Sequence, residues 1–97
     1  MATLQIKATP SGGLRRYRIG IDGKDVRMHA DNTDEFEVEG GCGDGSTHRL
    51  TYSLFGPAGA KLDITLKCEG ADIGSTGTIE IYPEGEPFAA GWQDFQI

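Results

Sequence analysis

Apolar and polar residues alternate with a period of two along most of this chain. The alternation is clearest in Lys61–Cys68, where every second residue from Leu62 onward is apolar and the residues between are polar. A period of two is that of a β-strand with one buried face, and no run of ten residues has a helical period. The pattern predicts strands at Thr3–Ala8, Leu14–Ile21, Val26–Ala30, Glu35–Glu39, His48–Phe55, Lys61–Cys68 and Thr78–Tyr82, with a last edge strand within Phe88–Ile97.

Turn signals separate these runs. Asp22-Gly23 between two alternating runs predicts a tight hairpin, because Asp and Gly tolerate the backbone angles of such a turn. Gly40–Ser46 and Glu69–Gly77 are predicted to be loops, and Pro83–Pro87 breaks the pattern again. Many short strands joined by tight turns indicate an all-β protein.

The chain of 97 residues predicts one domain, 1–97. We expect an antiparallel two-layer sandwich of immunoglobulin-like type with seven or eight short strands, and a small closed barrel is the alternative. One-sided alternation favours antiparallel pairing, because parallel strands are usually apolar on both faces.

Charge and hydropathy exclude some partners. The formal charge is −6, which repels nucleic-acid phosphate, and no apolar run is long enough to insert into a membrane. The first residues lack the features of a signal peptide. The protein is therefore expected in the cytoplasm by default, or outside it if a signal has been removed, so the compartment stays open.

The middle of the chain resembles small bacterial immunoglobulin-like modules, including PEGA domains. The matching residues are Ile21, Asp22, Gly23, Lys24, Val26, Thr33, Phe36, Val38, Gly45, His48 and Leu50. The resemblance implies a non-catalytic module, often extracytoplasmic, that serves as a spacer or as a binding or adhesion domain.

The two cysteines, Cys42 and Cys68, allow two interpretations. In an oxidising compartment a disulfide between them would close a loop of about 27 residues and stabilise the fold by roughly 3–4 kcal/mol. In a reducing compartment Cys68 would be a small core residue and Cys42 a free loop thiol. A thiol nucleophile formed by Cys42 with His48 as its base is a further hypothesis, which requires contact between them.

Metal and cofactor sites are not predicted. The soft ligands lack the close pairs typical of zinc sites, and the acids in turns are explained by local hydrogen bonding as well as by calcium. The soft ligands are His29, Cys42, His48 and Cys68, and the acids are Asp22, Asp25, Asp31, Asp34 and Asp44. The glycine-rich stretches lack the residues of a phosphate loop. We therefore predict no metal ligand, no cofactor and no catalytic residue.

Charges and aromatic residues outside the core suggest surfaces. Glu35, Glu37 and Glu39 form an acidic stripe, which we expect neighbouring strands to neutralise; the alternative is a cationic partner. The basic residues expected to neutralise it are Arg27 and His29, or Arg16 and Arg18. Four aromatic residues that the strand pattern does not force inward form a candidate partner surface. They are Phe55, Tyr82, Phe88 and Trp92.

These observations predict a non-catalytic binding or structural module that engages a protein partner or a carbohydrate. The protein partner is either another chain or a second copy, which would bind through an edge strand or the Phe88–Ile97 tail. One alternative is a small inhibitor or phage-type protein that presents the loops Gly40–Ser46 and Glu69–Thr76. The other is a cysteine-dependent hydrolase.

Overall fold

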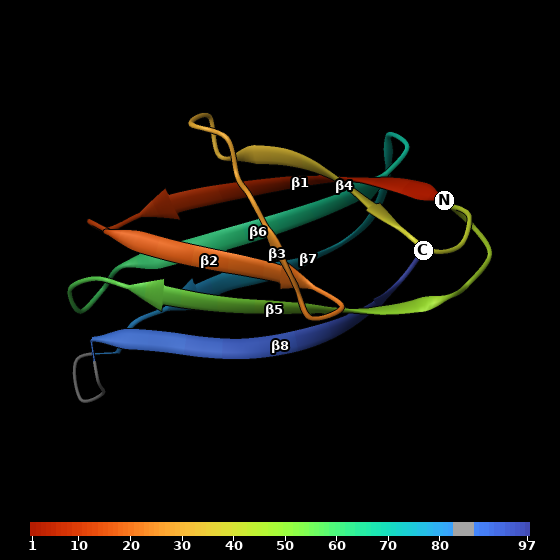
Figure 1. Ribbon diagram of the computed structural model, residues 1–97. Helices are drawn as coiled ribbons and strands as arrows, with labels where there is room; N and C mark the ends of the chain where they lie inside the picture. The colour runs from red at the N-terminus through yellow and green to blue at the C-terminus, as the bar shows by residue number, and fades with distance from the viewer. Residues whose placement is uncertain (83–86) are drawn as a thin grey trace.

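A computed structural model describes residues 1–82 and 87–97, which form eight strands (Figure 1). The strands are β1 Ala2–Ser11, β2 Arg16–Ile21, β3 Lys24–Val26, β4 Thr33–Val38, β5 Thr47–Phe55, β6 Lys61–Cys68, β7 Ala71–Glu80 and β8 Phe88–Gln96. In this described part of the chain, no helix has the length and apolar character needed to cross a membrane.

The strands form two four-stranded antiparallel sheets, which pack face to face as a sandwich. One sheet has the order β4-β1-β6-β7 and the other has the order β3-β2-β5-β8. The two-layer sandwich is thus confirmed, and the sheets do not close into the alternative barrel. β1 lies between β4 and β6 in the first sheet, and β2 lies between β3 and β5 in the second.

The predicted hairpin at Asp22-Gly23 joins β2 to β3. Both turn residues have positive φ, 51° at Asp22 and 81° at Gly23, which is the signature of a type I′ turn. Ile21 pairs with Lys24 directly across the turn. The turn therefore has the geometry that Asp-Gly favours between twisted strands.

The core lies between the two sheets and follows the predicted alternation. In β6 every second side chain from Leu62 to Cys68 is buried, and the residues between them are exposed or half-buried. In β1 the same holds from Ala2 to Ala8, and β1 pairs with β6 so that Ile6 lies opposite Leu66. The two central strands thus supply one wall of the core.

Several strand bounds differ from the prediction, and two of them differ by four residues or more. Ala71–Glu80 is a ten-residue strand, whereas Glu69–Gly77 was expected to be a loop. Most of its side chains are exposed, so its sequence has no apolar period that would predict a strand. The strand is stabilised by backbone pairing with β6. β3 ends at Val26 rather than Ala30, because the chain then crosses to the other sheet, where Asn32 accepts a hydrogen bond from the Ala8 N–H.

Candidate functional site

Exposed aromatic rings gather on the outer face of the β3-β2-β5-β8 sheet, which we call the aromatic face. At one end, Phe55 of β5 lies opposite Phe88 of β8, and their ring centroids are 6.1 Å apart. The Arg16 guanidinium of β2 lies 5.4 Å from the Phe55 ring centroid. Phe55 is 37% exposed and Phe88 46%, so this row of three side chains presents aromatic surface to solvent.

Trp92 lies two rows further along the same face of β8 and is 60% exposed. The Arg49 guanidinium stacks 4.0 Å from the indole centroid. Arg49 also donates two hydrogen bonds to Asp94, at 2.8 and 3.3 Å, and this bonding lowers the pKa of Asp94. The indole is therefore held on one side by an arginine that is itself fixed in place.

Small side chains lie between these two aromatic ends. Ser53 pairs with Ala90, and Thr51 lies between Gly20 and Trp92. A shallow hollow of about 230 Å³ opens over Gly20, Thr51 and Ser53. The aromatic face thus has a low centre between Phe55 and Phe88 at one end and Trp92 at the other.

Three of the four predicted partner-surface residues share this face, and the fourth does not. Tyr82 is 67% exposed, but it follows β7 and lies outside both sheets. No ring contact is found for it within residues 1–82 and 87–97. Tyr82 is therefore not part of the aromatic face.

Beside the aromatic face, a groove of about 590 Å³ runs between β2 and the segment 27–32. Four of the chain's five arginines line it, although the chain as a whole is acidic. They are Arg15, Arg16, Arg18 and Arg27. The Tyr17 hydroxyl donates a 2.7 Å hydrogen bond to Asn32 across the groove, and burial raises the pKa of Tyr17. We call this the arginine groove, and sequence reasoning missed it.

The prediction that basic residues of neighbouring strands neutralise the acidic stripe was wrong. β4, which carries Glu35 and Glu37, pairs with β1 in the other sheet, where Gln5 and Thr3 lie opposite them. Arginines of β2 therefore cannot be their cross-strand neighbours. Among the described residues, the basic side chains expected to neutralise the stripe form ion pairs only elsewhere, Arg18 with Asp25 and His29 with Asp34, although His29 lines a hollow together with Glu35.

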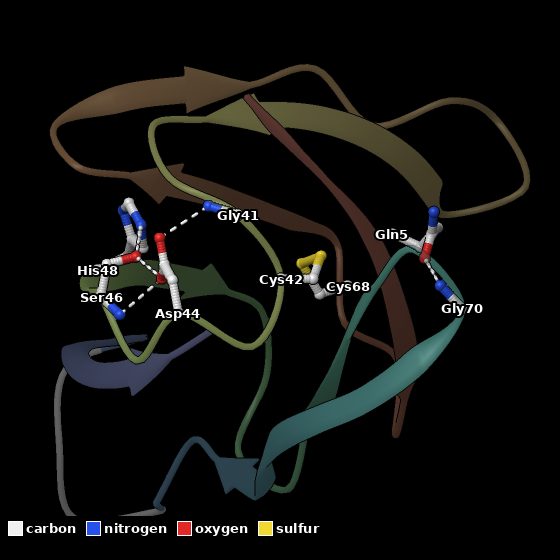
Figure 2. Close-up of a disulfide and its surroundings, with 8 residues drawn as sticks. All are labelled: Gln5, Gly41, Cys42, Asp44, Ser46, His48, Cys68 and Gly70. Atoms are coloured by element: carbon white, nitrogen blue, oxygen red, sulfur yellow. Dashed lines mark hydrogen bonds between the residues drawn. A yellow bond between two sulfur atoms is a disulfide. The ribbon is translucent and has the colours of Figure 1, made fainter.

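The structure joins Cys42 to Cys68 in a disulfide, with 5.8 Å between their Cα atoms (Figure 2). The bond ties the Gly40–Ser46 loop to the end of β6. Cys68 is buried at the edge of the core. Cys42 therefore has no free thiol here to act as a nucleophile.

Asp44 holds the same loop from within. It accepts hydrogen bonds from the backbone N–H groups of Gly41 and Ser46 and from the Ser46 hydroxyl, at 2.7–2.8 Å (Figure 2). These bonds, led by that from Gly41, lower the pKa of Asp44 to about 2. The C-terminal Ile97 also binds this loop, because it accepts from the Gly43 N–H and donates to the Ser46 carbonyl.

His48 is buried beside this loop, where its Nδ1 lies 2.6 Å from Asp22 and its Nε2 lies 3.4 Å from the Ser46 hydroxyl. The order of groups is that of a Ser-His-Asp triad, but the Ser46 hydroxyl donates its proton to Asp44. Burial raises the pKa of Asp22, yet hydrogen bonds from the Arg49 backbone and from His48 outweigh it and lower that pKa. The network fixes the hairpin turn to the loop.

Within residues 1–82 and 87–97, no three His, Cys, Asp or Glu side chains are placed to hold a metal ion. Asp31 accepts hydrogen bonds from Thr33, which is the local turn role expected for an acid in a loop.

In comparisons with known proteins, no family model, no curated protein and no solved structure matches the chain.

Proposed function

We propose that this protein is a non-catalytic binding module that engages a protein partner through its aromatic face. The observation that carries the proposal is the row of exposed rings on one sheet face, with Phe55 and Phe88 at one end and Trp92 at the other. Exposed aromatic residues beside arginines are the side chains most enriched among the residues that dominate protein-binding energy. Their gathering on one sheet face favours a macromolecular partner.

A protein partner is favoured over a carbohydrate by the placement of the arginines. Arg49 already stacks on Trp92, and Arg16 lies over Phe55, so each of these two rings has one face occupied. A sugar that stacks on an aromatic ring needs an open ring face. A protein side chain, in contrast, can pack against the edges of rings and against guanidinium groups at the same time. The aromatic face offers both.

A binding role without catalysis is supported by the state of the two side chains that could act as nucleophiles. The sulfur of Cys42 is bonded to Cys68, and the hydroxyl of Ser46 donates to Asp44 rather than to His48. The alternative of a loop-presenting inhibitor is weakened, because part of the predicted loop Glu69–Thr76 belongs to β7. The other loop, Gly40–Ser46, is fixed by the disulfide and by Asp44.

The test compares capture of a partner from the native source by three forms of the protein. The double variant Phe88→Ala with Trp92→Ala should lose at least tenfold in partner recovered relative to the unaltered protein. A matched control, Thr65→Ala with Lys67→Ala, changes exposed residues of the opposite sheet and should recover the partner normally. The purified partner should also shift the fluorescence of Trp92, the only tryptophan.

Equal recovery with the double variant, or unchanged Trp92 fluorescence in the complex, would contradict the proposal. The double variant removes only exposed side chains, so it is expected to fold. Circular dichroism of all three forms verifies this.

A further inference from the structure

The free half of strand β2 is an unfinished sheet edge. β3 pairs only with Ile19–Ile21, so Arg16–Arg18 has no strand beside it on that side among residues 1–82 and 87–97. The chain leaves the sheet after Val26, and the segment 27–32 forms the far wall of the arginine groove. The opening of about 590 Å³ therefore lies beside Arg16–Arg18, where β3 would have continued.

The backbone of Tyr17 faces into this opening. The Asp22 N–H donates to the Arg49 carbonyl of β5. This bond determines which residues of β2 direct their backbone N–H and carbonyl groups toward β5. Since backbone groups in an antiparallel ladder point to alternate sides, those of Arg16 and Arg18 face β5 and those of Tyr17 face the groove. Tyr17 thus offers one N–H donor and one carbonyl acceptor to an added strand.

The charge around this edge selects an acidic occupant. Four arginines line the groove, and the one ion pair found among them within the described residues joins Arg18 to Asp25 at 3.8 Å between exposed side chains. Exposed pairs of this kind are weak, so these guanidinium groups stay available for carboxylates. Tyr17 and Met28 add partly buried apolar surface at the base of the groove.

We propose that the arginine groove binds an extended acidic segment of a partner protein, which adds to β2 as a short antiparallel strand. Strand addition to an open edge is an established way to bind peptides, with the backbone giving affinity and alternate side chains giving specificity. A residue opposite Tyr17 faces inward and should be apolar, whereas its neighbours lie opposite Arg16 and Arg18 and should be acidic. The preferred pattern is acidic-apolar-acidic. This inference rests on the proposed function, in that it names the kind of protein segment the module takes.

The groove and the aromatic face are continuous, which supports a single partner. Arg16 lines the groove and also lies over the Phe55 ring, and Arg18 borders both the groove and the central hollow. A partner that laid an acidic segment beside β2 would reach the aromatic face without leaving the sheet.

The probe is a fluorescently labelled, blocked peptide of sequence Glu-Val-Glu-Val-Glu, titrated by anisotropy and by amide NMR. We expect saturable binding that weakens as salt is raised and that shifts the Tyr17 amide most. Arg18→Glu with Arg27→Glu should weaken binding at least tenfold. Lys61→Glu with Lys67→Glu, an equal change in net charge on the other sheet, should leave it within about twofold.

A backbone test separates strand addition from simple charge attraction. A methyl group on the nitrogen of the first Val removes the N–H that would bond to Tyr17 and should abolish binding. The first Val is the one that can lie opposite Tyr17, because an antiparallel peptide with its second Val there would place its first Val opposite Ile19, which already pairs with Val26. Methylation of the second Val in its place removes an N–H that would lie beyond Arg16, and it should weaken binding less.

Four results would overturn the inference. They are no binding of the unmethylated peptide, equal binding of a Lys-Val-Lys-Val-Lys peptide, insensitivity to Arg18→Glu with Arg27→Glu, and concentration-dependent doubling of mass that this double variant abolishes. The last result would make a second copy the occupant. Capture of a partner that needs Trp92 but not the arginines would overturn this inference alone and leave the proposed function standing.

Discussion

Removing the disulfide between Cys42 and Cys68 should destabilise the fold severely without changing its architecture. The bond joins residues 26 apart and connects the Gly40–Ser46 loop to the end of β6. Without it, the unfolded chain gains the freedom of an open loop of that length. In the chain-entropy model this costs about 3.5 kcal/mol of unfolding free energy.

The size of the effect on melting follows from the chain length. For a domain of 97 residues, 1 kcal/mol corresponds to a melting shift of about 5 °C, so the loss amounts to about 15–20 °C. The assay is thermal unfolding followed by circular dichroism, for the unaltered protein and for Cys42→Ala with Cys68→Ala. Protein prepared under reducing conditions should melt near the double variant.

A thiol count provides the control. Intact mass and alkylation under native conditions should find no reactive thiol in protein prepared in an oxidising buffer, and two after reduction and unfolding. Two alkylated thiols in the native oxidised preparation would refute the bond. A double variant that melted within a few degrees of the unaltered protein would refute the entropic reasoning.

Three further predictions concern the loop, the core and the sheet. The pKa of Asp44 is lowered to about 2, so its stabilising effect is complete above about pH 4 and is lost as the pH falls through about 2; Asp44→Asn should flatten the acid limb of a plot of melting temperature against pH. Gly91→Ala would place a Cβ 2.6 Å from the Tyr52 hydroxyl oxygen and should cost about 1–3 kcal/mol in urea unfolding, and unchanged stability would show that Tyr52 moves freely. Ile64→Ala removes a fully buried side chain and should cost about 2–4 kcal/mol, whereas Thr65→Ala on the exposed face should cost less than about 0.5 kcal/mol.

The strands that could be predicted are those whose side chains sort by burial. Lys61–Cys68 has the same bounds in the structure as in the prediction, because its alternate residues face a core on one side and solvent on the other. The end of β7 lies within the predicted strand Thr78–Tyr82, but its first seven residues, Ala71–Gly77, could not be found in this way, because Ser75, Thr76 and their neighbours have no apolar period. The missed signal was Glu69-Gly70, where positive φ values of 48° and 91° form a second tight hairpin turn.

The candidate site was predicted in part. The exposed rings of Phe55, Phe88 and Trp92 could be singled out because they fall on the polar side of strands or outside the periodic runs. The arginine groove could not, because it depends on where β3 stops. That boundary is set by a turn after Met28, in which the His29 N–H donates to the Thr33 carbonyl and the Asn32 N–H donates to the His29 carbonyl. The turn leads the chain to the other sheet, where the Ala8 N–H donates to the Asn32 carbonyl, and this contact between residues far apart in the chain leaves no local pattern in the sequence.

Strand β7 is a ten-residue edge strand of its sheet. The unpaired backbone groups of an edge strand of that length can pair with strands of other chains. Its register against β6 slips twice, and Gly74 and Gly77 adopt φ values of 151° and 68°. These irregularities break the even spacing that fibril growth requires. We therefore expect concentrated solutions of the folded protein to resist amyloid formation.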